Sequence, residues 1–209
     1  MKVWLSSLLV VGSLTMAPMS AQAFTDVNAR YQEAVDYMVS EGYTNGINAT
    51  QFGVDAPMKR LDAAVILAKV LGAESKAATV PFTDVPADRA WAVKALVDAG
   101  VTQGKSATRF GSNDAMTRAE MTRLLRITFN VAESNRAIPF TDVSPRFVKD
   151  VSALYELKVA TGKTSTRFGA EDTLKRGEFA LFLHKLAQVD EDFEEGEDWT
   201  GAPEVESIT

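Results

Sequence analysis

Three arginines recur along the chain at a spacing of 58 residues, as Arg60, Arg118 and Arg176. A guanidinium suits the binding of a carboxylate, because its planar fork donates two parallel hydrogen bonds that a lysine cannot reproduce. Each arginine stands at the predicted start of a helix, where free backbone N–H groups and the helix dipole also favour an anion. The three arginines could therefore bind an anionic ligand.

The net charge of −6 is distributed unevenly along the chain. Residues 24–189 carry 21 Lys and Arg against 19 Asp and Glu, a net charge of +2, whereas residues 190–209 carry nine acids and no base. A weakly basic body is compatible with an anionic ligand held by a few placed cations, but it lacks the broad positive footprint of a nucleic-acid-binding protein. We expect no nucleic-acid partner.

The chain has no cysteine, which excludes thiol catalysis, cysteine-ligated zinc and iron–sulfur sites. The Gly-Lys pairs at residues 104–105 and 162–163 lack the preceding glycine of a phosphate-binding loop. His184 is the only histidine and is expected on a solvated helix face, outside any metal or catalytic cluster. We therefore expect no metal, no cofactor, no catalytic residue and no enzymatic activity.

The first 23 residues have the pattern of a secretory signal peptide. Lys2 precedes an apolar stretch over residues 3–16, and Ala21-Gln22-Ala23 supplies the small residues that signal peptidase needs. The apolar stretch is shorter than the roughly 20 residues that span a bilayer. We expect cleavage after Ala23, a secreted protein, and no transmembrane segment after cleavage.

One sequence unit occurs three times, each copy opening with Phe-Thr-Asp-Val at residues 24–27, 82–85 and 140–143. The same offset aligns glycines, threonines and Phe-Gly pairs, namely Gly46, Gly104 and Gly162, then Thr50, Thr108 and Thr166, then the pairs that begin at Phe52, Phe110 and Phe168. So many matches at one offset indicate an internal repeat. We place the copies at residues 24–81, 82–139 and 140–189, followed by an acidic, disordered tail at 190–209.

Each copy contains two helical patterns separated by a loop rich in Gly, Thr, Asn and Asp. The apolar residues follow i, i+3, i+4 spacing, as at Val93, Leu96 and Val97 in the first helix and at Met121, Leu124 and Leu125 in the second. Two modest helices and a loop cannot bury both apolar faces alone, so the units must pack on one another. We predict an all-α fold of three helix–loop–helix repeats in a closed, pseudo-threefold cluster.

The combined motifs resemble the S-layer homology (SLH) family over residues 24–189. These motifs are Phe-x-Asp-Val, an amphipathic helix, a glycine-containing loop, Phe-Gly and the sequence Met116-Thr117-Arg118-Ala119-Glu120. The resemblance implies a pseudo-threefold helical spindle that anchors the protein to the bacterial cell wall or S-layer. It also implies that the grooves between neighbouring repeats bind an anionic secondary cell-wall polysaccharide, often one that carries pyruvate ketals.

The resemblance assigns polysaccharide binding to residues at matching positions in the repeats. These are Arg60, Arg118 and Arg176, then Asp26, Asp84 and Asp142. Lys105 and Lys163 are expected to support the arginines, and Trp91 is a further candidate for contact with the sugar. Structural alternatives stay open for several of them. The aspartates could cap the first helix, the arginines could pair internally with these aspartates, and Thr117 with Glu120 forms the pattern of a capping box.

The repeats also depart from one another, so that the grooves need not be equal. Ile47 stands where the other repeats have lysine, and Arg89 stands where they have the aromatic residues Tyr31 and Phe147. Two other functions remain as alternatives to anchoring. One is a structural S-layer or adaptor protein whose acidic tail recruits cations, a partner or other surface proteins, and the other is a wall-modifying glycosidase, which would need paired carboxylates.

Overall fold

A computed structural model describes residues 24–195 of the protein. The predicted signal peptide and residues 196–209 lie outside this part of the chain. Within this part of the chain the regular secondary structure is helical, with isolated β-bridges between loops but no β-strand. The elements are α1 (Gln32–Ser40), α2 (Arg60–Val70), η1 (Ala87–Arg89), α3 (Ala90–Asp98), α4 (Arg118–Thr128), η2 (Pro145–Phe147), α5 (Val148–Glu156) and α6 (Arg176–Glu195).

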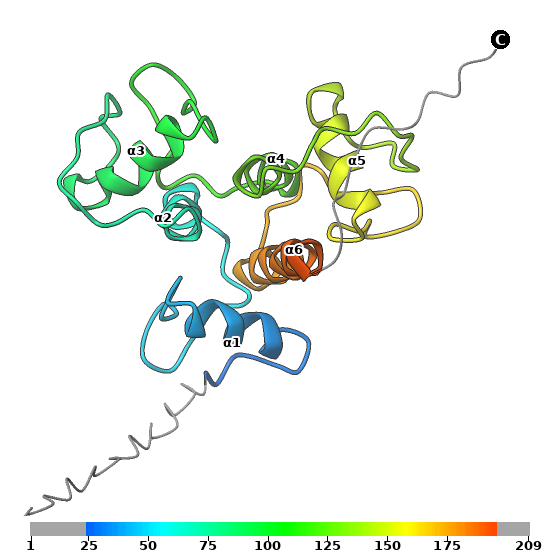
Figure 1. The fold of residues 1–209 in the computed structure, drawn as a ribbon, viewed down its shortest axis with the longest axis horizontal. Coiled ribbons are helices and arrows are strands. Elements are labelled where there is room, and N and C mark those ends of the chain that lie inside the picture. Colours follow the sequence, from blue (N-terminus) through cyan, green and yellow to red (C-terminus); the bar gives the residue numbers. More distant parts are fainter. Residues whose placement is uncertain (1–23, 196–209) are drawn as a thin grey trace, which may run out of the picture.

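The second helices of the three repeats, α2, α4 and α6, lie together at the centre, where Figure 1 shows them nearly end-on. The first helices, α1, α3 and α5, lie outside them. Each outer helix packs on the central helix of the preceding repeat, so that α3 contacts α2 and α5 contacts α4. The outer helix α1 packs on α6 and closes the ring. The predicted closed, all-α arrangement is confirmed.

Three backbone hydrogen bonds join the repeats in a cycle just before the central helices begin. Met58 N–H donates to the Leu174 carbonyl at 2.8 Å, Leu174 N–H to the Met116 carbonyl at 2.9 Å, and Met116 N–H to the Met58 carbonyl at 2.9 Å. These three side chains are fully buried and occupy one position of the repeat. Each repeat therefore donates to one neighbour and accepts from the other.

The outer helices end where one residue adopts a left-handed conformation. Gly42 and Gly100 have φ of 70°, and Lys158 takes the same place in the third repeat with φ of 58°. The central helices α2 and α4 end likewise, at Gly72 and Asn130, with φ of 71° and 51°. The equivalent residue of α6 is Gln188, and this helix continues to Glu195. The first six residues of the predicted disordered tail are therefore helical.

The aromatic residues of the repeat motifs form the core of each repeat. The Phe24 and Phe52 rings lie 5.7 Å apart, as do those of Phe82 and Phe110, and the third pair, Phe140 and Phe168, lies 5.4 Å apart. All six side chains are buried, as expected of core residues. The glycine of the loop packs against this pair, since a Cβ atom on Gly104 would lie 2.6 Å from the Phe82 ring. The repeated glycine is thus required by close packing.

Candidate anion-binding grooves

The central arginines are buried where neighbouring repeats meet. Arg60, Arg118 and Arg176 are 7%, 4% and 7% exposed. Each guanidinium stacks on the phenylalanine of the next repeat's Phe-Gly pair, with distances from Cζ to the ring centre of 5.0 Å to Phe110, 4.9 Å to Phe168 and 5.0 Å to Phe52. Burial lowers the pKa of all three below the ordinary value for arginine, although a guanidinium remains protonated at any physiological pH.

Two of these arginines have few hydrogen-bond acceptors in the protein. Arg60 Nη2 donates to Thr102 Oγ1 at 2.8 Å, and Arg176 Nη2 donates to Thr44 Oγ1 at 2.5 Å. The buried Nε–H of each has no hydrogen-bond partner among the described residues. A buried N–H without an acceptor is uncommon in native proteins, and water or a ligand often supplies one.

Arg118, in contrast, donates through all three of its nitrogens. Nε donates to the Phe168 carbonyl at 3.2 Å, Nη2 to the Thr161 carbonyl at 3.1 Å, and Nη1 to Glu178 Oε1 at 3.2 Å. Arg60 and Arg176 each donate to a threonine, and at the equivalent position of the third repeat this threonine is replaced by Ala160. The three sites that the repeat pattern makes equivalent are therefore chemically different.

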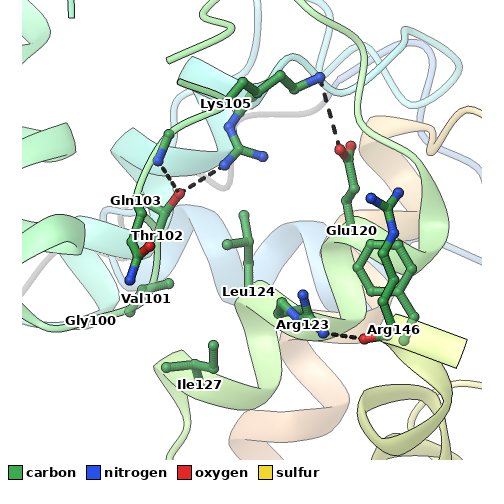
Figure 2. Close-up of a pocket in the computed structure, with 13 residues that line it drawn as sticks. Gly100, Val101, Thr102, Gln103, Lys105, Glu120, Arg123, Leu124, Ile127 and Arg146 are labelled. Atoms are coloured by element: carbon green, nitrogen blue, oxygen red, sulfur yellow. Dashed lines mark hydrogen bonds and ion pairs between the residues drawn. The ribbon is translucent and has the colours of Figure 1, made fainter. Parts of the chain in front are cut away.

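A groove of about 700 Å³ opens beside Arg60. Its walls come from the loop at residues 100–105, from α4 and from η2 of the third repeat, and Figure 2 shows Lys105, Glu120, Arg123 and Arg146 around it. Four cationic side chains line the groove, including Arg60, against the single carboxylate of Glu120. Lys105 and Arg123 are also paired with carboxylates outside the groove lining, those of Asp114 and Asp150. Arg60 and Arg146 form no such ion pair among the described residues, and their positive charge suits an anionic ligand.

A second groove, of about 450 Å³, lies at the equivalent place beside Arg176. Its cationic side chains are Arg176, Lys69 and Arg89, and its carboxylate is Asp62. Ile47, which is 54% exposed, stands where the groove beside Arg60 has Lys105. This groove is consequently less cationic and has a more apolar rim.

The starts of the central helices are not open to an anion, contrary to the expectation from the sequence. Arg60 N–H donates to the Asp114 carbonyl at 3.0 Å, and Leu61 N–H donates to the Ser112 carbonyl at 3.1 Å. The first two N–H groups of α4 and α6 donate in the same way to the loop of the following repeat. The neighbouring repeat therefore satisfies the donors that an anion would need. In α4, Thr117 and Glu120 also form the expected capping box.

The three repeat aspartates hold the loops of their own repeats. The Asp84 carboxylate accepts hydrogen bonds from the backbone N–H groups of Phe110, Gly111 and Ser112 at 2.7 to 2.8 Å. Asp26 and Asp142 bind the equivalent N–H groups. They neither cap the outer helices nor form hydrogen-bonded pairs with the central arginines, so both structural alternatives raised by the sequence are wrong.

The remaining predicted residues lie in different surroundings. Lys105 Nζ lies 2.9 Å from Asp114 and 3.9 Å from Glu120 at the rim of the groove, and Lys163 Nζ lies 2.7 Å from Asp172. Trp91 packs half-buried against the core from α3 and does not line the two grooves described above. His184 is half-buried rather than solvated, because its ring lies 5.0 Å from that of Tyr37 on α1.

Two groove residues, Arg123 and Arg146, were not among those that the sequence singled out. Arg146 and Phe147 stack on each other at 4.5 Å, and Arg123 donates to the Arg146 carbonyl and stacks on the same ring at 4.8 Å. In the described part of the chain no carboxylate forms an ion pair with Arg146. These residues are not shared by all repeats, so the 58-residue offset could not identify them. Only their charge and proximity to a predicted loop distinguish them.

The fold defines a module of three helix–loop–helix repeats that close into a ring. The chain belongs to the S-layer homology family: the S-layer homology domain matches residues 23–64, 81–122 and 139–180, together more than half of the chain. Three tandem S-layer homology repeats were the architecture expected from the sequence, and this expectation is confirmed.

Relatives of the chain include large surface proteins. It is 31% identical over 87% of its length to a Surface-layer 125 kDa protein of Lysinibacillus sphaericus, and 26% identical over 87% to a Cell surface protein of Thermoanaerobacter kivui. It is also 34% identical over 51% of its length to an Endoglucanase of a Bacillus species. The match covers 16%, 23% and 12% of these proteins, respectively.

Family membership and these relatives make the chain a secreted, cell-surface anchoring module. No helix within residues 24–195 combines the length and apolar character needed to cross a membrane.

Proposed function

We propose that this module binds an anionic secondary cell-wall polysaccharide, with carboxylates such as pyruvate ketals held in the grooves between repeats. The observation that carries the proposal is the pairing of an under-bonded, buried arginine with a cationic groove. Arg60 uses one nitrogen in a protein hydrogen bond, and the groove beside it is lined by four cations and one carboxylate. A ligand carboxylate would supply the missing acceptor.

Stacking on Phe110 holds the Arg60 guanidinium in place before any ligand arrives. A preorganised donor loses little side-chain entropy on binding, and therefore retains more of the energy of its hydrogen bonds. A hydrogen bond to a charged group contributes about 1.5 to 3 kcal/mol. Arg146 and Lys105 stand at the edge of the groove, where they would attract the anion.

The proposed role is binding without catalysis. Glycoside hydrolysis ordinarily uses two carboxyl groups on either side of the scissile bond. The groove beside Arg60 has one carboxylate in its lining, that of Glu120, and this side chain accepts a hydrogen bond from the Thr117 N–H in the capping box. The groove beside Arg176 likewise has one carboxylate, Asp62. This composition favours anchoring over the glycosidase alternative.

The test is calorimetric binding of the protein to wall polysaccharide with and without its pyruvate groups. We expect binding that requires pyruvate and that Arg146→Gln weakens, because Arg146 is exposed at the groove. Lys76→Gln is the matched control, since it removes one positive charge from an exposed side chain that lines neither groove. The proposal would be contradicted if the affinity were the same with and without the pyruvate groups, or if both variants lowered the affinity equally.

A further inference from the structure

The acid near the start of each central helix decides whether an arginine is internally neutralised. These acids are Asp62, Glu120 and Glu178, at one position of the repeat. Glu178 reaches Arg118 of the preceding repeat at 3.2 Å. Glu178 and Glu120 each also accept a hydrogen bond through Oε2 from the N–H three residues before them, that of Lys175 at 3.1 Å and that of Thr117 at 3.2 Å. The difference is in Oε1, which in Glu120 lies 3.9 Å from Lys105 and forms no ion pair with Arg60. Asp62, which is one methylene shorter, approaches Arg89 at 3.8 Å.

Arg118 is consequently the one central arginine with a carboxylate within salt-bridge distance in the described chain. It is also enclosed by two aromatic rings. Its Cζ lies 4.9 Å from the centre of the Phe168 ring and 5.1 Å from that of Phe182. The positions equivalent to Phe182 are Ile66 and Leu124, which are smaller and have no ring.

We infer that the three arginine sites are functionally unequal. Glu178 acts as a counter-anion within the protein and blocks the site at Arg118, whereas ligand carboxylates bind at Arg60 and Arg176. This inference rests on the proposed function, and specifies which of its sites operate. A carboxylate arriving at Arg118 would have to displace Glu178 and would exchange one ionic hydrogen bond for another. At Arg60 and Arg176 it adds an ionic hydrogen bond to a guanidinium whose Nε–H has no acceptor among the described residues.

The experiment uses a small monovalent probe, a methyl glycoside carrying one pyruvate ketal, so that sites can be counted. Calorimetry gives the stoichiometry, and the arginine Nε–H signals in NMR spectra show which guanidinium groups the probe approaches. We expect two sites per chain, with the Nε–H signals of Arg60 and Arg176 shifting and that of Arg118 unchanged.

Lysine variants separate binding from stability. Arg60→Lys keeps the charge but loses the planar fork, and should weaken one site roughly tenfold to a hundredfold. Arg118→Lys should leave both sites intact while lowering the melting temperature, since it removes bonds internal to the protein. Glu178→Gln should give a third site. Glu171→Gln is its control, because Glu171 is an exposed acid of the same repeat that lines neither groove.

The possible results distinguish this inference from the proposed function. A probe that binds nowhere on the wild-type protein overturns both. Three outcomes would overturn the inference of unequal sites but leave the proposed binding function intact. They are three sites in the wild-type protein, loss of a site in Arg118→Lys, and a stoichiometry that Glu178→Gln does not change. Two sites that become three in Glu178→Gln support the inference.

Discussion

At the scale of single residues, one repeat position can have different costs in different copies. The left-handed residue that ends each outer helix is Gly42, Gly100 and Lys158. A side chain at positive φ places its Cβ close to the backbone, which costs roughly 1 to 2 kcal/mol relative to the ordinary helical region, whereas glycine has no such penalty. The third repeat therefore keeps the turn at a price in strain that the first two avoid.

Lys158→Gly should consequently stabilise the protein. We expect the free energy of unfolding to rise by up to about 1 kcal/mol, because the relief of strain exceeds the extra flexibility that glycine gives the unfolded chain. Urea-induced unfolding measures it. The reverse exchange, Gly100→Lys, is the matched control and should destabilise by a similar amount. A loss of stability in Lys158→Gly would show that the lysine side chain has a compensating contact.

The repeat aspartates make stability depend on pH in the acid range. Burial tends to raise the pKa of the Asp84 carboxyl, but the backbone N–H groups of Ser112, Phe110 and Gly111 outweigh it and lower the pKa below its ordinary value. The same holds for Asp26 and Asp142. Because the folded pKa is lower than the unfolded one, this stability is present above about pH 4 and is lost as pH falls through the folded pKa.

Asp84→Asn tests this dependence. We expect the variant to be less stable than the wild-type protein at pH 7 and its stability to fall less between pH 5 and pH 2. Urea midpoints measured across this range give the comparison. Asp36→Asn is the control, because this exposed carboxyl on α1 accepts a hydrogen bond from the Gln32 side chain and not from a loop N–H group. It should leave the dependence of stability on pH unchanged. Equal slopes in the wild-type protein and Asp84→Asn would contradict the prediction.

At the scale of helices, the three equivalent helix pairs are held together differently. In the pair α4 and α5, Asp150 is 1% exposed and accepts from Arg123 Nε at 2.9 Å and from Arg126 Nε at 2.6 Å. The equivalent positions in the pair α2 and α3 are Ala92, Val65 and Ala68. One interface therefore contains a buried ion cluster where its counterpart is apolar.

Asp150→Ala should destabilise the protein by about 3 to 5 kcal/mol, since it leaves two guanidinium groups without their shared carboxylate. The triple change Arg123→Val, Arg126→Ala and Asp150→Ala reproduces the apolar counterpart and should recover most of that loss. Equilibrium unfolding by urea measures both. If the triple variant is no more stable than Asp150→Ala, then the ion cluster has a structural role that an apolar interface does not replace.

The extent to which sequence predicts this structure follows from what the repeats share. The helices, the capping box at Thr117 and the aromatic core all recur or obey local rules, and could be read from periodicity. The contacts of Asp84 could not, because it binds backbone N–H groups 26 to 28 residues away, which no side-chain pattern reveals. The pairing of Arg118 with Glu178 depends on rotamers and on the neighbouring repeat, so that identical residue types in the alignment gave different bonds.

At the scale of the whole molecule, the grooves and the acidic C-terminal segment are separate parts of the chain. The residues that line the two grooves lie between Tyr43 and Arg176, whereas the nine acids that could recruit cations or a partner lie at 190–206. Deleting residues 190–209 removes all nine acids of the segment and ends α6 at Val189, close to where α2 and α4 end in their repeats.

We expect this deletion to leave polysaccharide binding unchanged, because it removes no groove residue. Calorimetry and retention of the protein on cells give two separate readouts. Unchanged binding with impaired surface assembly would support the adaptor alternative, whereas unchanged values of both would remove it. A loss of binding would contradict the assignment of binding to the grooves.

The packing of α1 on α6 also determines how the chain can fold. In an open array of repeats, each unit stacks on the one before it and folding can spread along the chain as it emerges. Here the first outer helix has no partner until the last central helix exists, and the cycle through Met58, Met116 and Leu174 needs all three copies. Closure of the ring is therefore a late event governed by contacts distant in sequence, and these are slow to form. The closed fold forms only when the last repeat is available, and this order suits a polypeptide that is threaded through an export channel before it folds.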